Sequence, residues 1–102
     1  MVLIYTSCKN TEEAVTIGND LLKQRLVAAV DLWPIQHMRQ VDGGIKNELH
    51  TSMIVHTTEP RMQEIEDVIT KHRSYTTPYV GAIDIRRFNR PYRQWMFFVI
   101  KQ

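Results

Sequence analysis

Cysteine, glycine and proline are scarce in this sequence, and it has no long hydrophobic run. Cys8 is the only cysteine, so no disulfide can form within the chain and a reducing compartment is expected. No segment rich in proline, glycine or serine interrupts the chain, which excludes a flexible linker between domains. With 102 residues, 43% of them hydrophobic and 24% charged, the composition is typical of one folded unit. We therefore predict a single domain over residues 1–102.

An excess of charge of one sign is also lacking. Thirteen basic and eleven acidic residues give a net charge of +2, so we expect neither a nucleic acid nor a membrane as partner. The opening "MVLIYTS" has no basic segment, and its apolar run is too short for a signal peptide or a membrane span, which predicts a cytoplasmic protein. Four arginines crowd into eight positions, namely Arg86, Arg87, Arg90 and Arg93. A solvated surface is the favoured interpretation of that group, and a phosphate site is the alternative.

Catalytic motifs are missing as well. The chain has no Ser-His-Asp signature, no P-loop, no GxGxxG and no paired-carboxylate motif, so we predict that it is not an enzyme. Cys8 precedes a predicted helix, but no base lies beside it in sequence, and we interpret it as a passive residue. A small enzyme or an RNA-binding domain is the least favoured hypothesis, because the central strands lack the basic and aromatic pattern of RNA-recognition domains.

What is present is a hydrophobic pattern that alternates between strands and helices. Strands are predicted over 2–6, over 26–33 with a continuation through 36–41, over 48–57 and over 79–85, and helices are predicted to begin at Asn10, Thr58 and Asn89. A break or bulge is expected near Pro34, and the hairpin turn is expected within 42–44. The order β-α-β-β-α-β with a C-terminal helix predicts an α+β, ferredoxin-like fold, in which two helices cover one face of an antiparallel sheet.

The uncovered face of that sheet is predicted to meet another subunit. It carries many apolar residues for a solvated surface, and the long central hairpin would project beyond so small a domain. On the second hairpin strand, Leu49, Met53 and Val55 share one face, and His50, Ser52, Ile54 and His56 share the other.

The four histidines do not have the spacing of a metal-binding motif. With a two-residue loop at Gly43 and Gly44, His37 would lie opposite His50 across the hairpin. An exposed pair without a metal-binding role is the favoured interpretation of that arrangement.

Short motifs along nearly the whole chain, taken in order, resemble the CutA-type divalent-cation-tolerance proteins. The opening "IYTSCKNTEEAVTIGNDLLKQRLVAAVDLWP" is similar to that family's first strand, acidic helix and "LAAC-N-IP"-like strand. "DGGI" is similar to its "EGKI" hairpin, "IVHTTEPR" to its "IIKTT" strand end, "HRSYTTPYVGAIDI" to its "HPY-TPEI", and "RPYRQWM" to its terminal "YL-W". The chain resembles a divergent member of this family, which belongs to the PII-like superfamily.

The resemblance implies a homotrimer in which hairpin strands of neighbouring subunits join into continuous sheets. It also implies a role in tolerance of copper and other divalent cations, without enzymatic activity. Tyr5 stands where the family has a copper-linked cysteine, and Arg73 stands in place of the second of two adjacent histidines. The resemblance therefore leaves His72 as the candidate metal ligand, with weakened binding of copper(II) or another divalent cation.

A second hypothesis follows from the similarity to PII signalling proteins. These proteins bind small effectors between subunits, which implies a sensor that binds a small anionic ligand in that cleft. Arg73, Tyr75, Thr77 and Trp95 are the candidate residues of the ligand cleft. The arginines of the 86–93 group would add positive charge to such a site.

Overall fold

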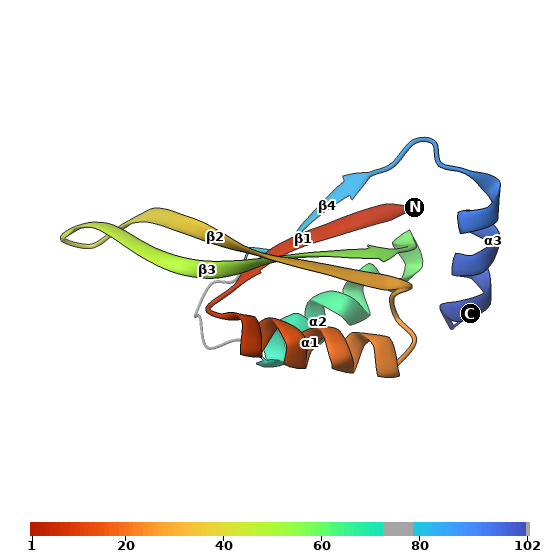
Figure 1. The fold of residues 1–102 in the computed structure, drawn as a ribbon, viewed down its shortest axis with the longest axis horizontal. Coiled ribbons are helices and arrows are strands. Elements are labelled where there is room, and N and C mark those ends of the chain that lie inside the picture. Colours follow the sequence, from red (N-terminus) through yellow and green to blue (C-terminus); the bar gives the residue numbers. More distant parts are fainter. Residues whose placement is uncertain (73–78, 102) are drawn as a thin grey trace.

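The fold is a four-stranded antiparallel sheet with two helices on one face and a third helix at one end (Figure 1). A computed structural model describes residues 1–72 and 79–101. The elements are β1 (Val2–Cys8), α1 (Thr11–Lys23), β2 (Ala29–Val41), β3 (Gly44–Thr57), the 3-10 turn η1 (Glu59–Arg61), α2 (Met62–His72), β4 (Gly81–Asp84) and α3 (Arg90–Val99). The strand order is β2-β3-β1-β4, which confirms the predicted ferredoxin-like fold. No helix within the described ranges is both long and apolar enough to cross a bilayer.

Helix α1 begins and packs as the sequence predicts. The side chain of Asn10 accepts a hydrogen bond from the backbone N–H of Glu13 at 2.8 Å, and so satisfies one free donor of the first turn. Gly18 faces the sheet, where a Cβ atom would lie only 3.3 Å from Cγ1 of Val30. The absence of a side chain at this position therefore lets α1 lie close to β2.

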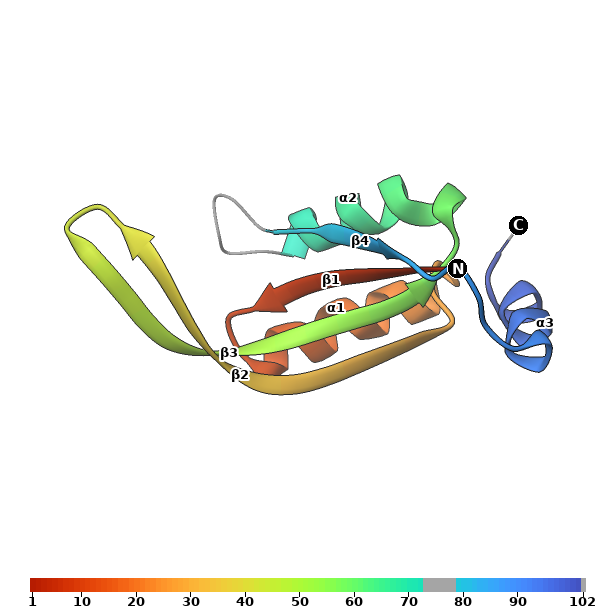
Figure 2. The same cartoon turned by 90° about the horizontal axis from the view of Figure 1, so that it is seen from above.

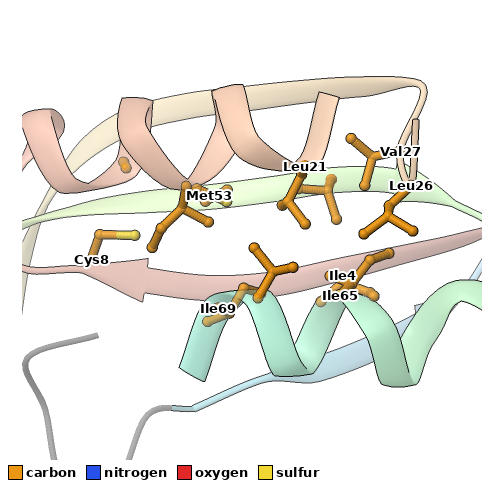
Figure 3. Close-up of a cluster of buried hydrophobic side chains, with 12 residues drawn as sticks. Ile4, Cys8, Leu21, Leu26, Val27, Met53, Ile65 and Ile69 are labelled. Atoms are coloured by element: carbon orange, nitrogen blue, oxygen red, sulfur yellow. The ribbon is translucent and has the colours of Figure 1, made fainter. Parts of the chain in front are cut away.

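A hydrophobic core fills the space between the sheet and helices α1 and α2 (Figure 3). Ile4 and Met53 contribute from the sheet, Leu21 from α1, and Ile65 and Ile69 from α2, and each is fully buried. Cys8 is also fully buried in this core, in agreement with a passive role. Burial of this kind is the main term that stabilises so small a chain.

Strands β2 and β3 form a long, continuous hairpin that extends beyond the helices (Figures 1 and 2). The break expected near Pro34 is wrong, because this residue pairs with Thr51 in an unbroken register. Strand β2 lies at the edge of the sheet, where a proline without an N–H is tolerated. The turn is Asp42 and Gly43, followed by Gly44, and both glycines have positive φ, at 92° and 143°.

That turn shifts the register from the one considered in the sequence. His37 pairs with Glu48, and His50 pairs with Ile35, so the placement of His37 directly opposite His50 is wrong. The two-residue loop begins one residue earlier than expected. Moving a loop by one position along the chain changes the partner of every strand residue by two positions.

The remaining elements differ from the predictions mainly in length. Thr58 stands at the cap position, but its side chain makes no capping hydrogen bond, and the 3-10 turn η1 precedes α2. Strand β4 is limited to Gly81–Asp84, shorter than the predicted 79–85. The phenol of Tyr79 packs against Gly81, where a Cβ atom would lie 2.5 Å from the Tyr79 hydroxyl. The predicted C-terminal helix is confirmed as α3, and Met96 is the buried residue on its inner side.

Candidate functional site

His72, the candidate metal ligand, is the last residue of α2 and is held by α1. Its Nε2 lies 2.7 Å from Oδ2 of Asp20. Hydrogen bonds from Gln24 and then from His72 hold the pKa of the Asp20 carboxyl below its usual value. A shallow cavity beside the ring is lined by Lys9, Asn10, Glu12, Glu13, Thr16 and His72. The imidazole thus belongs to the helical layer and faces the polar start of α1.

Of the other predicted site residues, Trp95 alone is among the described residues, and it lies far from His72. Arg73, Tyr75 and Thr77 lie outside the described residues. Trp95 is on α3, at the end of the molecule away from the hairpin, whereas α2 ends on the hairpin side (Figures 1 and 2). Trp95 packs instead against Tyr92, with ring centroids 5.3 Å apart. His72 and Trp95 therefore cannot line one cleft within a single chain.

An aromatic cluster lies on the sheet face that α1 and α2 leave open. The Tyr5 hydroxyl and Oγ of Ser52 are 2.8 Å apart, within hydrogen-bonding distance. The Tyr5 ring lies 6.5 Å from Trp33 and 6.1 Å from Tyr79, measured between centroids. Tyr5 occupies the position where the resemblance implies a copper-linked cysteine. A neutral phenol hydrogen-bonded to a serine is a poor ligand for a soft cation.

A second cluster continues along the same face of the hairpin. The His37 and His50 rings stack with centroids 4.5 Å apart and an interplanar angle of 12°, as diagonal neighbours across the strands. Oε1 of Glu48 lies 3.5 Å from Nε2 of His50 and 3.0 Å from Nη1 of Arg39. Burial, followed by the positive charge of His37, lowers the pKa of His50, while Glu48 opposes that shift. The cluster is thus arranged to keep His50 neutral near pH 7.

A third group, which the sequence did not reveal, joins the sheet to α3. Nδ1 of His56 lies 2.7 Å from the Tyr92 hydroxyl, and Nε2 lies 2.8 Å from Oδ2 of Asp31. Burial, and then the negative charge of Asp31, raises the pKa of Tyr92, so its hydroxyl stays protonated. Only the β2–β3 register could have revealed this group, because Asp31 and His56 are 25 positions apart.

These groups offer little for metal chelation within one chain. Across residues 1–72 and 79–101, no three His, Cys, Asp or Glu side chains are placed to hold a metal ion together. His72 with Asp20 supplies one imidazole oriented by a carboxylate, which is a common arrangement around a metal ligand. Any stronger site would need donors in addition to this pair.

The whole chain is similar in sequence and in structure to proteins of one family. The model of the CutA1 divalent ion tolerance protein family matches residues 2–97. The divalent-cation tolerance protein CutA of Archaeoglobus fulgidus is 33% identical over 93 residues, which cover 91% of each chain. The divalent-cation tolerance protein CutA of Thermotoga maritima is 28% identical over 96 residues, which cover 94% of this chain and 95% of the T. maritima protein. The solved structure of the periplasmic divalent cation tolerance protein CutA from A. fulgidus superposes on this chain with a TM-score of 0.95 and 31% sequence identity. The superposition covers 99% of this chain and 100% of the A. fulgidus chain. The chain therefore belongs to the CutA1 divalent ion tolerance family.

Proposed function

We propose that this chain is a non-enzymatic, cytoplasmic homotrimer that takes part in the response to divalent metal ions and binds copper(II) or a similar cation weakly through His72. The observation that supports the metal-binding part is the His72–Asp20 pair. A carboxylate hydrogen-bonded to one imidazole nitrogen fixes the ring and makes the other nitrogen a better ligand. With Tyr5 in place of a thiolate, the affinity is low.

Exposed apolar side chains on the hairpin support the trimer. Leu49 is 74% exposed, Ile45 is 70% exposed and Met38 is 62% exposed, although all three lie in a regular part of β2 or β3. Side chains of this kind on a projecting hairpin favour contact with another copy of the chain. Strand β2 also presents an open edge that another strand can pair with.

Calorimetry with copper(II) tests the metal-binding part. We expect weak binding to the unmodified chain and its loss in His72→Ala, while His37→Ala, which removes an imidazole on the hairpin, binds as before. Equal binding by all three proteins would contradict the role of His72. Sedimentation velocity tests the assembly separately, and a monomer at micromolar concentration would contradict the trimer.

A small anionic ligand remains the second candidate, because two arginines line one cavity. Arg86 and Arg93 meet there with Met1, Thr58 and Phe88. Two guanidinium groups on one recess attract phosphate or carboxylate groups. Titration with inorganic pyrophosphate tests this proposal: we expect Arg86→Gln/Arg93→Gln to abolish binding and Arg87→Gln to retain it. No heat of binding to the unmodified chain would contradict it.

A further inference from the structure

In a single copy of the chain, the outer surface of α3 presents exposed aromatic side chains. Trp95 is 43% exposed, Phe97 is 59% exposed and Phe98 is 80% exposed, while Met96 and Ile100 on the inner side are buried. This helix forms the end of the molecule opposite the hairpin (Figures 1 and 2). The three aromatic side chains therefore form a terminal surface, which we call the α3 aromatic patch.

The fold holds this patch outward. The Arg25 guanidinium donates hydrogen bonds to the carbonyl oxygens of Phe98 and Val99, both at 3.0 Å, and the Arg25 carbonyl accepts from the N–H of Lys101 at 2.8 Å. At the other end of α3, the Tyr92 hydroxyl bonds to His56 at 2.7 Å. With both ends of the helix fixed in this way, rotation of the aromatic rings inward would break these hydrogen bonds.

Basic residues predominate in the chain segment that carries the α3 aromatic patch. From position 85 to the end of the sequence there are five basic residues and no acidic residue. Arg87 and Arg90 are exposed on the segment that leads into α3 and on its first turn. The acidic residues lie earlier in the sequence; Glu64 pairs with Lys101, and Asp31 bonds to His56 beside Tyr92, so the excess positive charge rests on the arginines.

We propose that the α3 aromatic patch and its flanking arginines dock on the surface of an anionic lipid bilayer. Exposed tryptophan and phenylalanine next to arginine are typical of helices that lie in the interfacial region, where the rings insert among the acyl chains and the cations meet phosphate groups. The cationic surroundings make an anionic bilayer the complementary partner. The net charge of +2 for the whole chain predicts no membrane partner. Arginine and aromatic residues are nevertheless concentrated at the α3 end of the molecule. This docking is peripheral and does not depend on the proposed metal or anion binding.

Vesicle binding by the full chain tests the proposal. In a Trp33→Phe background, Trp95 is the only tryptophan and reports directly on the patch. We expect a blue-shifted Trp95 emission and cosedimentation with phosphatidylcholine vesicles that contain phosphatidylserine, and weaker binding as salt is raised. Phe97→Ser/Phe98→Ser and Arg87→Gln/Arg90→Gln should each lower the partition coefficient by about tenfold or more.

Matched controls separate this surface from the rest of the molecule. Val15→Ser changes a side chain on α1 that is 43% exposed, and Lys9→Gln/Lys71→Gln removes two positive charges elsewhere, so both should bind as the unmodified chain does. Absence of binding, equal binding to pure phosphatidylcholine, or an equal loss in the controls would overturn the proposal. Binding to polyuridylate or polyglutamate without binding to vesicles would also overturn it, and would assign the surface to a nucleic acid or an acidic protein.

Discussion

The two faces of the sheet are built from alternate residues of the same strands, yet they are organised differently. On the helix-covered face, Ile4 and Met53 are fully buried among side chains of α1 and α2. On the open face, Tyr5 and Ser52 share a hydrogen bond and Ile54 is only partly buried. The covered face is completed by this chain alone, whereas the open face retains surface that further contacts can bury.

Substitution of neighbouring residues on β3 provides the strongest test of this difference. Met53→Ala, on the covered face, should lower the free energy of unfolding by about 2–5 kcal/mol, because it leaves a cavity in a fully packed core. Ile54→Ala, one residue later on the open face, should cost only about 1 kcal/mol, because its side chain is partly exposed. Urea denaturation at one fixed protein concentration measures both.

Equal losses for the two variants would contradict the difference between the faces. A loss for Ile54→Ala that grows with protein concentration would instead indicate that another copy covers the open face, as proposed for the trimer.

Much of the covered side could be predicted from the sequence, because its signals are local. The cap formed by Asn10 and the apolar stripes of α1 and α2 each depend on residues within a few positions of one another. The break expected at Pro34 was wrong, since the edge position of β2 depends on the order of the strands in the sheet.

The candidate site was harder to predict, because its groups meet over long separations. The His56 group needs the exact β2–β3 register, and the turn placed that register two positions from the one considered. Trp95 resembled a site residue in sequence, but the path of the chain carries it to the end away from His72. The resemblance to the family identified the fold, but it could not show that Trp95 and His72 lie far apart within one chain, because their separation is set by tertiary structure.

Hydroxyl groups on the two faces offer a second, smaller test. Oγ1 of Thr57, buried on the covered side, donates to the Leu26 carbonyl at 2.7 Å, so Thr57→Val should cost about 1–3 kcal/mol by leaving that acceptor unpaired. Tyr5→Phe removes the bond to the buried Ser52 on the open face and should cost less, about 1 kcal/mol, because Tyr5 itself is only partly buried. Thermal unfolding of the two variants measures the difference. A cost for Tyr5→Phe as large as that for Thr57→Val would contradict the prediction, because it would show that the Tyr5 hydroxyl is as completely enclosed as the Thr57 hydroxyl.

His50 provides the smallest expected effect and, like Ser52, is an exception on the open face, because it is only 5% exposed. Burial, and then the charge of His37, lowers its pKa from the usual value of 6.5. Between the lowered pKa and 6.5, the unfolded chain binds more protons than the folded chain, so the free energy of unfolding falls as the pH drops below about 6.5. One such group contributes a slope of at most about 1.4 kcal/mol per pH unit. Urea denaturation across this range should show a shallower slope for His50→Gln than for the unmodified chain. In His37→Gln the slope should persist in reduced form, because burial of His50, the larger cause of its lowered pKa, remains. Identical slopes for His50→Gln and the unmodified chain would contradict the prediction, because they would show that His50 is protonated as easily in the folded chain as in the unfolded chain.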